Sequence, residues 1–188
     1  MYRVIITVVT ILILLIGCQS SNFIVSEVEK ATVSKTSDEV RKDDFVFRLV
    51  TEKEQYEEGE EVKLYGEIEY VGNRNGVVIS HSSSAILYTI EEKIRGFVIE
   101  GAVTNVGLTT NLKQGVSYRE EYMKSGGYSP TQDTKDFVRF MRDFLAREDF
   151  PTGHYVVKGM ADFSVVIDMK EQQQKNYKIE AEVDFIVN

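Results

Sequence analysis

The chain has 188 residues, of which 43% are hydrophobic and 28% are charged, and its net charge at pH 7 is −8. This length and composition predict one globular domain with a hydrophobic core, because two ordinary domains need a longer chain. The acidic balance argues against the basic surface by which proteins bind nucleic acids, so no nucleic-acid partner is expected. The single cysteine excludes an intramolecular disulfide, and the core alone must therefore hold the fold.

Residues 1–17 have the features of a secretory signal peptide. One basic residue, Arg3, precedes an apolar run that extends from Val4 to Ile16. A positive start, an apolar core of about 7–15 residues and a small residue at the cleavage site are typical of export signals. The run is shorter than the roughly 20 apolar residues that a transmembrane helix requires. We therefore predict that this segment is cleaved.

The apolar run ends in Leu15-Ile16-Gly17-Cys18, which resembles the lipobox of bacterial lipoproteins. That motif has Leu at −3, a small residue at −1 and Cys at +1, and Ile at −2 is less usual than Ser or Ala. The resemblance implies cleavage between Gly17 and Cys18, a diacylglycerol on the Cys18 thiol, and further acylation of the new amino terminus. The implied location is the extracytoplasmic face of the cell membrane, where two lipid chains anchor a protein stably. The alternative is an incidental cysteine at the end of a membrane anchor.

Residues 18–43 are predicted to be the lipidated cysteine followed by a flexible linker. The segment is rich in Ser, Thr, Lys and Glu and has few large apolar residues. Such a segment buries too little apolar surface to offset the entropy lost on ordering. The folded domain is therefore expected to span residues 44–188.

Alternation of apolar and polar residues predicts that this domain is mainly β. It is clearest at residues 62–70, where Val62, Leu64, Ile68 and Tyr70 share one face, as in a half-buried antiparallel strand. The other predicted strands are residues 45–50, 77–80, 85–90, 95–103, 117–123, 155–165 and 177–187. About eight short strands separated by turns predict an antiparallel β-sandwich.

The last two predicted strands are expected to form a hairpin, because each alternates over its whole length. In the second of them the polar residues are expected to face solvent: Lys178, Glu180, Glu182 and Asp184.

One amphipathic helix is predicted between the strands, at about residues 130–147. Ser129, Pro130 and Gln132 are typical of a capped helix start. Apolar residues then recur at i, i+3, i+4, i+7 and i+8 and form one stripe: Phe137, Phe140, Met141, Phe144 and Leu145. One interpretation is that the stripe packs against the sheet. The other is a partner-binding face, which would be formed by Phe137, Phe140, Met141 and Phe144.

Two short motifs resemble those of the immunoglobulin-like domains of bacterial surface proteins. Residues 55–60 are similar to their Y-x-x-G-E motif, and residues 151–155 to their P-G-x-Y motif. The resemblance implies an immunoglobulin-like β-sandwich in which Tyr155 makes a corner hydrogen bond. Proteinase inhibitors of the bacilli share this general layout. The predicted helix before Pro151 departs from a plain sandwich.

No catalytic or metal-binding set is predicted, and no cofactor is expected. His81 and His154 are the only histidines, whereas a zinc site needs three or four ligands. His154 precedes a strand and is expected to face solvent. The run from His81 to Ser84 lacks the sequence context of a nucleophilic serine, so a polar loop is predicted there.

Pairs of adjacent carboxylates are interpreted as solvated charge at turns and strand edges. Neighbouring residues of a strand point to opposite faces, so an adjacent pair does not form the facing carboxyl couple of a glycosidase. The pairs are Glu57-Glu58, Glu60-Glu61, Glu91-Glu92 and Glu120-Glu121.

These observations lead to the hypothesis of a lipid-anchored extracytoplasmic protein that is not an enzyme. It would be anchored in the membrane by the lipid on Cys18 and would bind a protein or envelope partner through its loops. The alternative is a proteinase inhibitor that acts on a secreted or surface protease.

Overall fold

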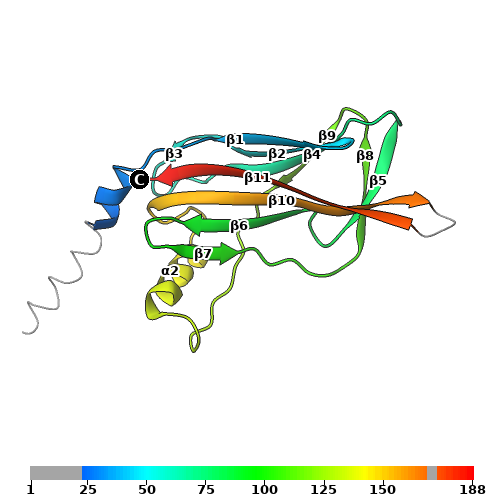
Figure 1. The fold of residues 1–188 in the computed structure, drawn as a ribbon. Helices are drawn as coiled ribbons and strands as arrows, with labels where there is room; N and C mark the ends of the chain where they lie inside the picture. The colour runs from blue at the N-terminus through cyan, green and yellow to red at the C-terminus, as the bar shows by residue number, and fades with distance from the viewer. Residues whose placement is uncertain (1–22, 169–172) are drawn as a thin grey trace, which may run out of the picture.

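The computed structural model describes residues 23–168 and 173–188, which form a mainly β sandwich with one inserted helix, as predicted (Figure 1). In chain order the elements are β1 (Ser37–Lys42), β2 (Phe45–Thr51), β3 (Gln55–Tyr56), β4 (Leu64–Tyr70), β5 (Gly76–His81), β6 (Ile86–Glu92), β7 (Phe97–Glu100), β8 (Leu108–Lys113), β9 (Ser117–Glu121), α2 (Lys135–Ala146), β10 (Gly153–Asp168) and β11 (Gln173–Val187). Residues 23–28, at the start of the first described range, are helical and precede them. No helix in the described ranges is long and apolar enough to cross a membrane.

The two sheets are built around different strands. The first sheet has the order β1-β2-β4-β9, and all its pairs are antiparallel. In the second sheet, β10 pairs with β11 along one edge and with β6 and β5 along the other, while β7 and β8 lie outside β6 and β5. The predicted hairpin of the last two strands is confirmed. One short parallel pair, β3 with β11, was not expected from the sequence.

The core lies between the sheets, and two glycines set their separation. Gly66 of β4 leaves room for Ile86 of the opposite sheet, since a Cβ at Gly66 would lie 2.7 Å from the Ile86 Cδ1. Gly159 of β10 does the same for Leu49, whose Cδ1 would lie 2.8 Å from a Cβ there. Phe47, which is fully buried, lies close to both glycines. Each sheet therefore receives a side chain of the other at a position without a side chain of its own.

The ordered domain begins earlier than the predicted boundary at residue 44. Residues 37–42 of the expected linker form β1, which pairs with β2 from Ser37↔Val50 to Lys42↔Phe45. The linker prediction failed because β1 is an edge strand that hardly buries side chains. Its stability comes from backbone pairing, which leaves no apolar pattern in the sequence.

The segment before β1 is bonded to the outer side of β11 through Asp184. The Asp184 carboxylate accepts from the backbone N–H of Ser34 at 2.9 Å, from that of Lys35 at 2.9 Å, and from His154 Nε2 at 2.9 Å. Asp184 is 5% exposed, although it was predicted to face solvent, and the partly buried His154 was wrongly expected to face solvent as well. Both predictions failed because the segment that covers them is remote in sequence.

The outer edge of β11 is closed by backbone bonds to segments that are not long strands. The N–H of Asp184 donates to the Lys35 carbonyl at 3.0 Å, that of Ile186 to Glu54 at 2.9 Å, and that of Asn188 to Tyr56 at 3.0 Å. The backbone N–H groups that this part of β11 directs away from β10 are therefore bonded to carbonyl groups from the first half of the chain.

Helix α2 begins at Lys135 rather than at the predicted position near residue 130. Thr134 is the N-cap, and its side chain accepts from the Phe137 N–H. The residues predicted as the cap form a separate turn, in which the Asp133 N–H donates to the Ser129 carbonyl at 3.0 Å. The Ser129 N–H in turn donates to the Asp133 carboxylate at 2.6 Å, so this side chain stabilises the turn instead of the helix.

The corner hydrogen bond implied by the P-G-x-Y motif is present. The Tyr155 hydroxyl donates to the Pro151 carbonyl at 2.6 Å, and the Tyr155 ring is fully buried. Burial raises the pKa of Tyr155 well above its usual range, so the hydroxyl stays protonated and remains a donor.

Candidate functional site

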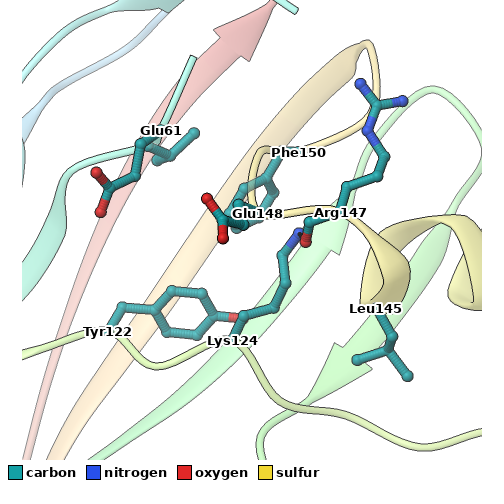
Figure 2. Close-up of a pocket in the computed structure, with 8 residues that line it drawn as sticks. Glu61, Tyr122, Lys124, Leu145, Arg147, Glu148 and Phe150 are labelled. Atoms are coloured by element: carbon teal, nitrogen blue, oxygen red, sulfur yellow. Dashed lines mark hydrogen bonds between the residues drawn. The ribbon is translucent and has the colours of Figure 1, made fainter. Parts of the chain in front are cut away.

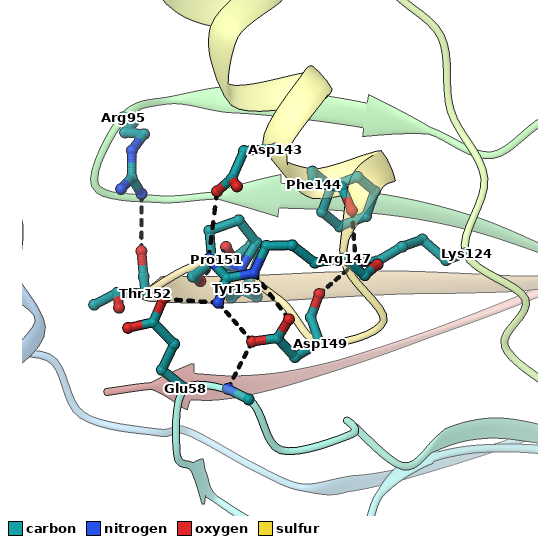
Figure 3. Close-up of polar contacts among 11 residues, drawn as sticks. Glu58, Arg95, Lys124, Asp143, Phe144, Arg147, Asp149, Pro151, Thr152 and Tyr155 are labelled. Atoms are coloured by element: carbon teal, nitrogen blue, oxygen red, sulfur yellow. Dashed lines mark hydrogen bonds and ion pairs between the residues drawn. The ribbon is translucent and has the colours of Figure 1, made fainter.

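The side chain of Lys124 closes the C-terminal end of α2 (Figure 3). Its Nζ donates to the carbonyl oxygens of Phe144 at 2.7 Å and Arg147 at 3.1 Å, and also to that of Asp149. Helix C-termini leave carbonyls without partners and favour a cation. Burial lowers the pKa of this ammonium to about 8. Because three carbonyls take its three protons, Lys124 stabilises the helix end rather than offering a donor to a ligand.

Arg147 and Asp149 form a two-bond ion pair directly after α2. Arg147 Nε lies 2.8 Å from Asp149 Oδ1, and Arg147 Nη2 lies 2.6 Å from Asp149 Oδ2. Asp149 also accepts from the Gly59 N–H at 2.6 Å, and Arg147 donates to Glu58 at 2.7 Å. The bonds from Arg147 hold the pKa of Asp149 at about 2. These contacts join the end of α2 to the turn between β3 and β4, as Figure 3 shows.

Asp149→Asn is expected to lower the free energy of unfolding by roughly 1.5–3 kcal/mol at neutral pH, because the guanidinium and the Gly59 N–H lose a charged acceptor. The folded pKa of Asp149 lies below its ordinary value of 3.8, so its contribution is complete above about pH 4 and is lost as the pH falls towards about 2. Urea denaturation of wild type and Asp149→Asn at several pH values should therefore show a difference in the free energy of unfolding that disappears at low pH.

The exposed pair of Asp136 and Arg139 supplies the control. Asp136→Asn should change the stability by less than about 1 kcal/mol at any of these pH values, because both side chains are solvated and Asp136 otherwise interacts only with the N-terminal dipole of α2. If the difference in the free energy of unfolding between wild type and Asp149→Asn stayed constant down to low pH, the role assigned to the ionised Asp149 would be contradicted.

A partly open pocket of about 530 Å³ lies beside this ion pair (Figure 2). Its lining residues are Glu61, Val62, Tyr122, Lys124, Leu145, Arg147, Glu148 and Phe150. The two cations in the lining are already bonded to the chain, as described above. The Phe150 ring is also occupied, since it is 2% exposed and the Lys124 ammonium lies 4.9 Å from its centre. What remains open to a ligand is Tyr122 and Leu145 beside the carboxylates of Glu61 and Glu148.

The loop from His81 to Ser84 does not bring a base to a serine hydroxyl. His81 Nε2 lies 2.9 Å from the Thr110 hydroxyl, and His81 Nδ1 donates to the Ser82 carbonyl at 2.8 Å. Ser84 Oγ instead bonds the Glu120 carboxylate and the Ile86 carbonyl. The arrangement is that of the polar loop predicted from the sequence.

Two of the carboxylates interpreted as solvated charge are structural. Glu92 is fully buried and accepts from the N–H groups of Ile94 at 3.1 Å and Arg95 at 2.8 Å. Glu120 accepts from the Ala85 N–H at 3.2 Å and the Tyr118 hydroxyl at 2.7 Å. Glu92 was predicted wrongly because a side chain at the end of a strand can bond the backbone of the turn that follows it. Glu120 of β9 was predicted wrongly because its partners lie in the connection between β5 and β6, which is remote in sequence.

The helix face is not free for a partner. Of the four residues considered for a partner-binding face, Phe140, Met141 and Phe144 are buried, and Phe137 packs on Phe97 of β7 with ring centres 5.4 Å apart. The interpretation that the stripe packs against the sheet therefore fits these four residues, whereas Leu145, the fifth residue of the predicted stripe, is 39% exposed. The other predicted site residues, Leu15, Ile16, Gly17 and Cys18, lie outside the described residues.

Sequence reasoning missed Lys124 and the pair of His154 and Asp184. No local pattern marks them, because their partners are carbonyl and N–H groups of remote segments. No group of three or more potential metal ligands is found within residues 23–168 and 173–188. The chain matches no protein-family model, and no curated protein is similar to it.

Proposed function

We propose that this protein is a lipid-tethered extracytoplasmic domain that binds a protein or an envelope component and is not an enzyme. The observation that carries the proposal is the run Leu15-Ile16-Gly17-Cys18 at the end of an apolar leader. A diacylglycerol at Cys18 supplies the two chains that stable anchoring requires. The acidic surface offers no electrostatic attraction to anionic lipid headgroups, so the lipid would have to provide the attachment.

The shape of the domain supports binding through loops. Residues 23–28 lie at one end of the sandwich, and the connections β1–β2, β4–β5 and β8–β9 meet at the other end (Figure 1). Backbone bonds fix these connections to one another: the Val71 N–H donates to Asp44 at 2.8 Å and the Gln114 N–H to Asn75 at 3.1 Å. A tether at the first end would leave this preformed loop surface pointing away from the membrane, where a partner can reach it.

Cys18→Ala is expected to abolish lipid attachment and to move most of the protein from the membrane fraction to the soluble fraction or the medium. The measurement is fractionation of the host cells combined with the intact mass of the purified protein. Ser20→Ala is the control, because it keeps the motif, and it should leave both readouts unchanged. A Cys18→Ala protein that fractionates with membranes like wild type would disprove the tether.

Crosslinking on intact host cells, followed by purification and mass spectrometry, identifies the partner. Variants in the loop surface, such as Arg74→Glu, should lose the crosslinked species while the domain remains folded. Recovery of a protease as the crosslinked species, together with its inhibition by the purified domain, would instead support the proteinase inhibitor.

A further inference from the structure

Two apolar side chains of the helical residues 23–28 are exposed at the end of the sandwich nearest the proposed tether. Phe23 is 57% exposed and Val25 is 49% exposed. In contrast, Val28 is 4% exposed, so the chain joins the folded domain within one and a half turns of helix. The Glu29 N–H donates to the Val25 carbonyl at 3.0 Å, and the Ala31 N–H to Val28 at 3.0 Å.

The chain length between Cys18 and this helix limits how far it can lie from the membrane. Phe23 follows Cys18 by five residues, which span at most about 18 Å when fully extended. The headgroup region on each side of a bilayer is itself several ångströms thick. A lipid on Cys18 therefore keeps Phe23 and Val25 within reach of the interface, where helices bury apolar side chains such as Phe at the boundary of headgroups and acyl chains.

We propose that Phe23 and Val25 insert into the membrane interface and dock this end of the sandwich onto the lipid surface. The inference rests on the proposed function, because the lipid on Cys18 brings the helix to the bilayer. Lipid, rather than a protein, covers these two apolar side chains, because the tether keeps the bilayer permanently close to them. The binding depends on apolar contact, because Glu27 and Glu29 of the same segment do not attract anionic headgroups.

The contacts of Asp184 connect the docked helix to the rest of the domain. Ser34 and Lys35 are bonded to β11 through the Asp184 carboxylate and backbone, so the segment that follows the helix does not swing freely. A docked helix therefore fixes which end of the sandwich faces the membrane. The loop surface at the far end is then directed outwards in one orientation, rather than sampling all directions on a long linker as the sequence predicted.

The absence of tryptophan from the sequence makes this inference directly measurable. Phe23→Trp and Val25→Trp each introduce one fluorophore at the proposed contact. Val78→Trp is the matched control, because Val78 is 52% exposed and belongs to β5, a strand near the far end of the sandwich in Figure 1. The full-length proteins are purified with their lipid and placed in phosphatidylcholine vesicles whose acyl chains carry bromine, which quenches tryptophan on contact.

The expected result is a blue-shifted emission and at least about twofold quenching at positions 23 and 25, with a water-exposed spectrum and little quenching at position 78. Lipidated protein without quenching at 23 and 25, or with equal quenching at all three positions, would overturn the docking and leave the tether intact. A mass without lipid on Cys18 would overturn the proposed function and the docking with it.

Discussion

Phe144→Ala is expected to lower the free energy of unfolding by about 3–5 kcal/mol, the range for removing a fully buried aromatic ring. Phe144 is 0% exposed, and its ring lies 5.1 Å from that of Phe150 and 6.1 Å from that of Phe140. The ammonium of Lys124 lies 4.1 Å from its centre, so the variant also loses a cation–π contact. Urea denaturation of the chain without its leader measures the loss.

Leu145→Ala is the control for this prediction. Leu145 is the next residue of the same helix but is 39% exposed, so its truncation should cost less than about 1 kcal/mol. Equal costs for the two variants would show that α2 is not held by its apolar stripe. A stable Phe144→Ala protein that lost a binding partner would revive the partner-binding interpretation of this face.

Asp184→Ala is expected to destabilise the domain by about 3 kcal/mol, because it removes a buried charged acceptor from two backbone N–H groups and His154. Burial by itself would raise the pKa of Asp184, but hydrogen bonds from the Lys35 and Ser34 backbone and from His154 outweigh it and hold the pKa below its ordinary value. The carboxylate is therefore charged at neutral pH, and its contribution is present above about pH 4 and lost in acid.

Hydrogen exchange distinguishes this local effect from general destabilisation. The amides of Ser34 and Lys35 should lose at least about tenfold of their protection in Asp184→Ala, more than the amides of β4 lose. Glu182→Ala is the matched control, since Glu182 lies two residues away on the same strand with a largely solvated side chain. Unchanged protection at residues 34 and 35 would contradict the role assigned to Asp184.

The sequence predicted those elements whose side chains divide between core and solvent. β4, β10 and β11 were found because apolar residues recur at every second position and face the opposite sheet. β1 and β8 were missed because they are edge strands with few buried side chains, and pairing of the backbone leaves no apolar pattern. The start of α2 was misplaced because Ser129 and Thr134 are both good capping residues, and only the contact of Asp133 decides between them.

The polar residues with structural roles were harder to predict for a different reason. Asp184 and Glu92 occupy positions that alternate like solvent-facing residues, so local sequence assigns them to the surface. Their burial depends on a segment that folds over them, either from the start of the chain or from the adjacent turn. Tyr155 was the exception, because the motif around it specifies its partner, Pro151, within four residues.

The covered edge of β11 would matter for the proposed tether, which would confine many copies of the protein to one surface. Copies confined to a surface collide often, and an open strand edge on each would let neighbouring chains extend one another's sheets into insoluble assemblies. The N–H groups of Asp184, Ile186 and Asn188 are already paired within the same chain. The hairpin of β10 and β11 therefore offers no template along this stretch, and copies held by the proposed tether would not polymerise through it.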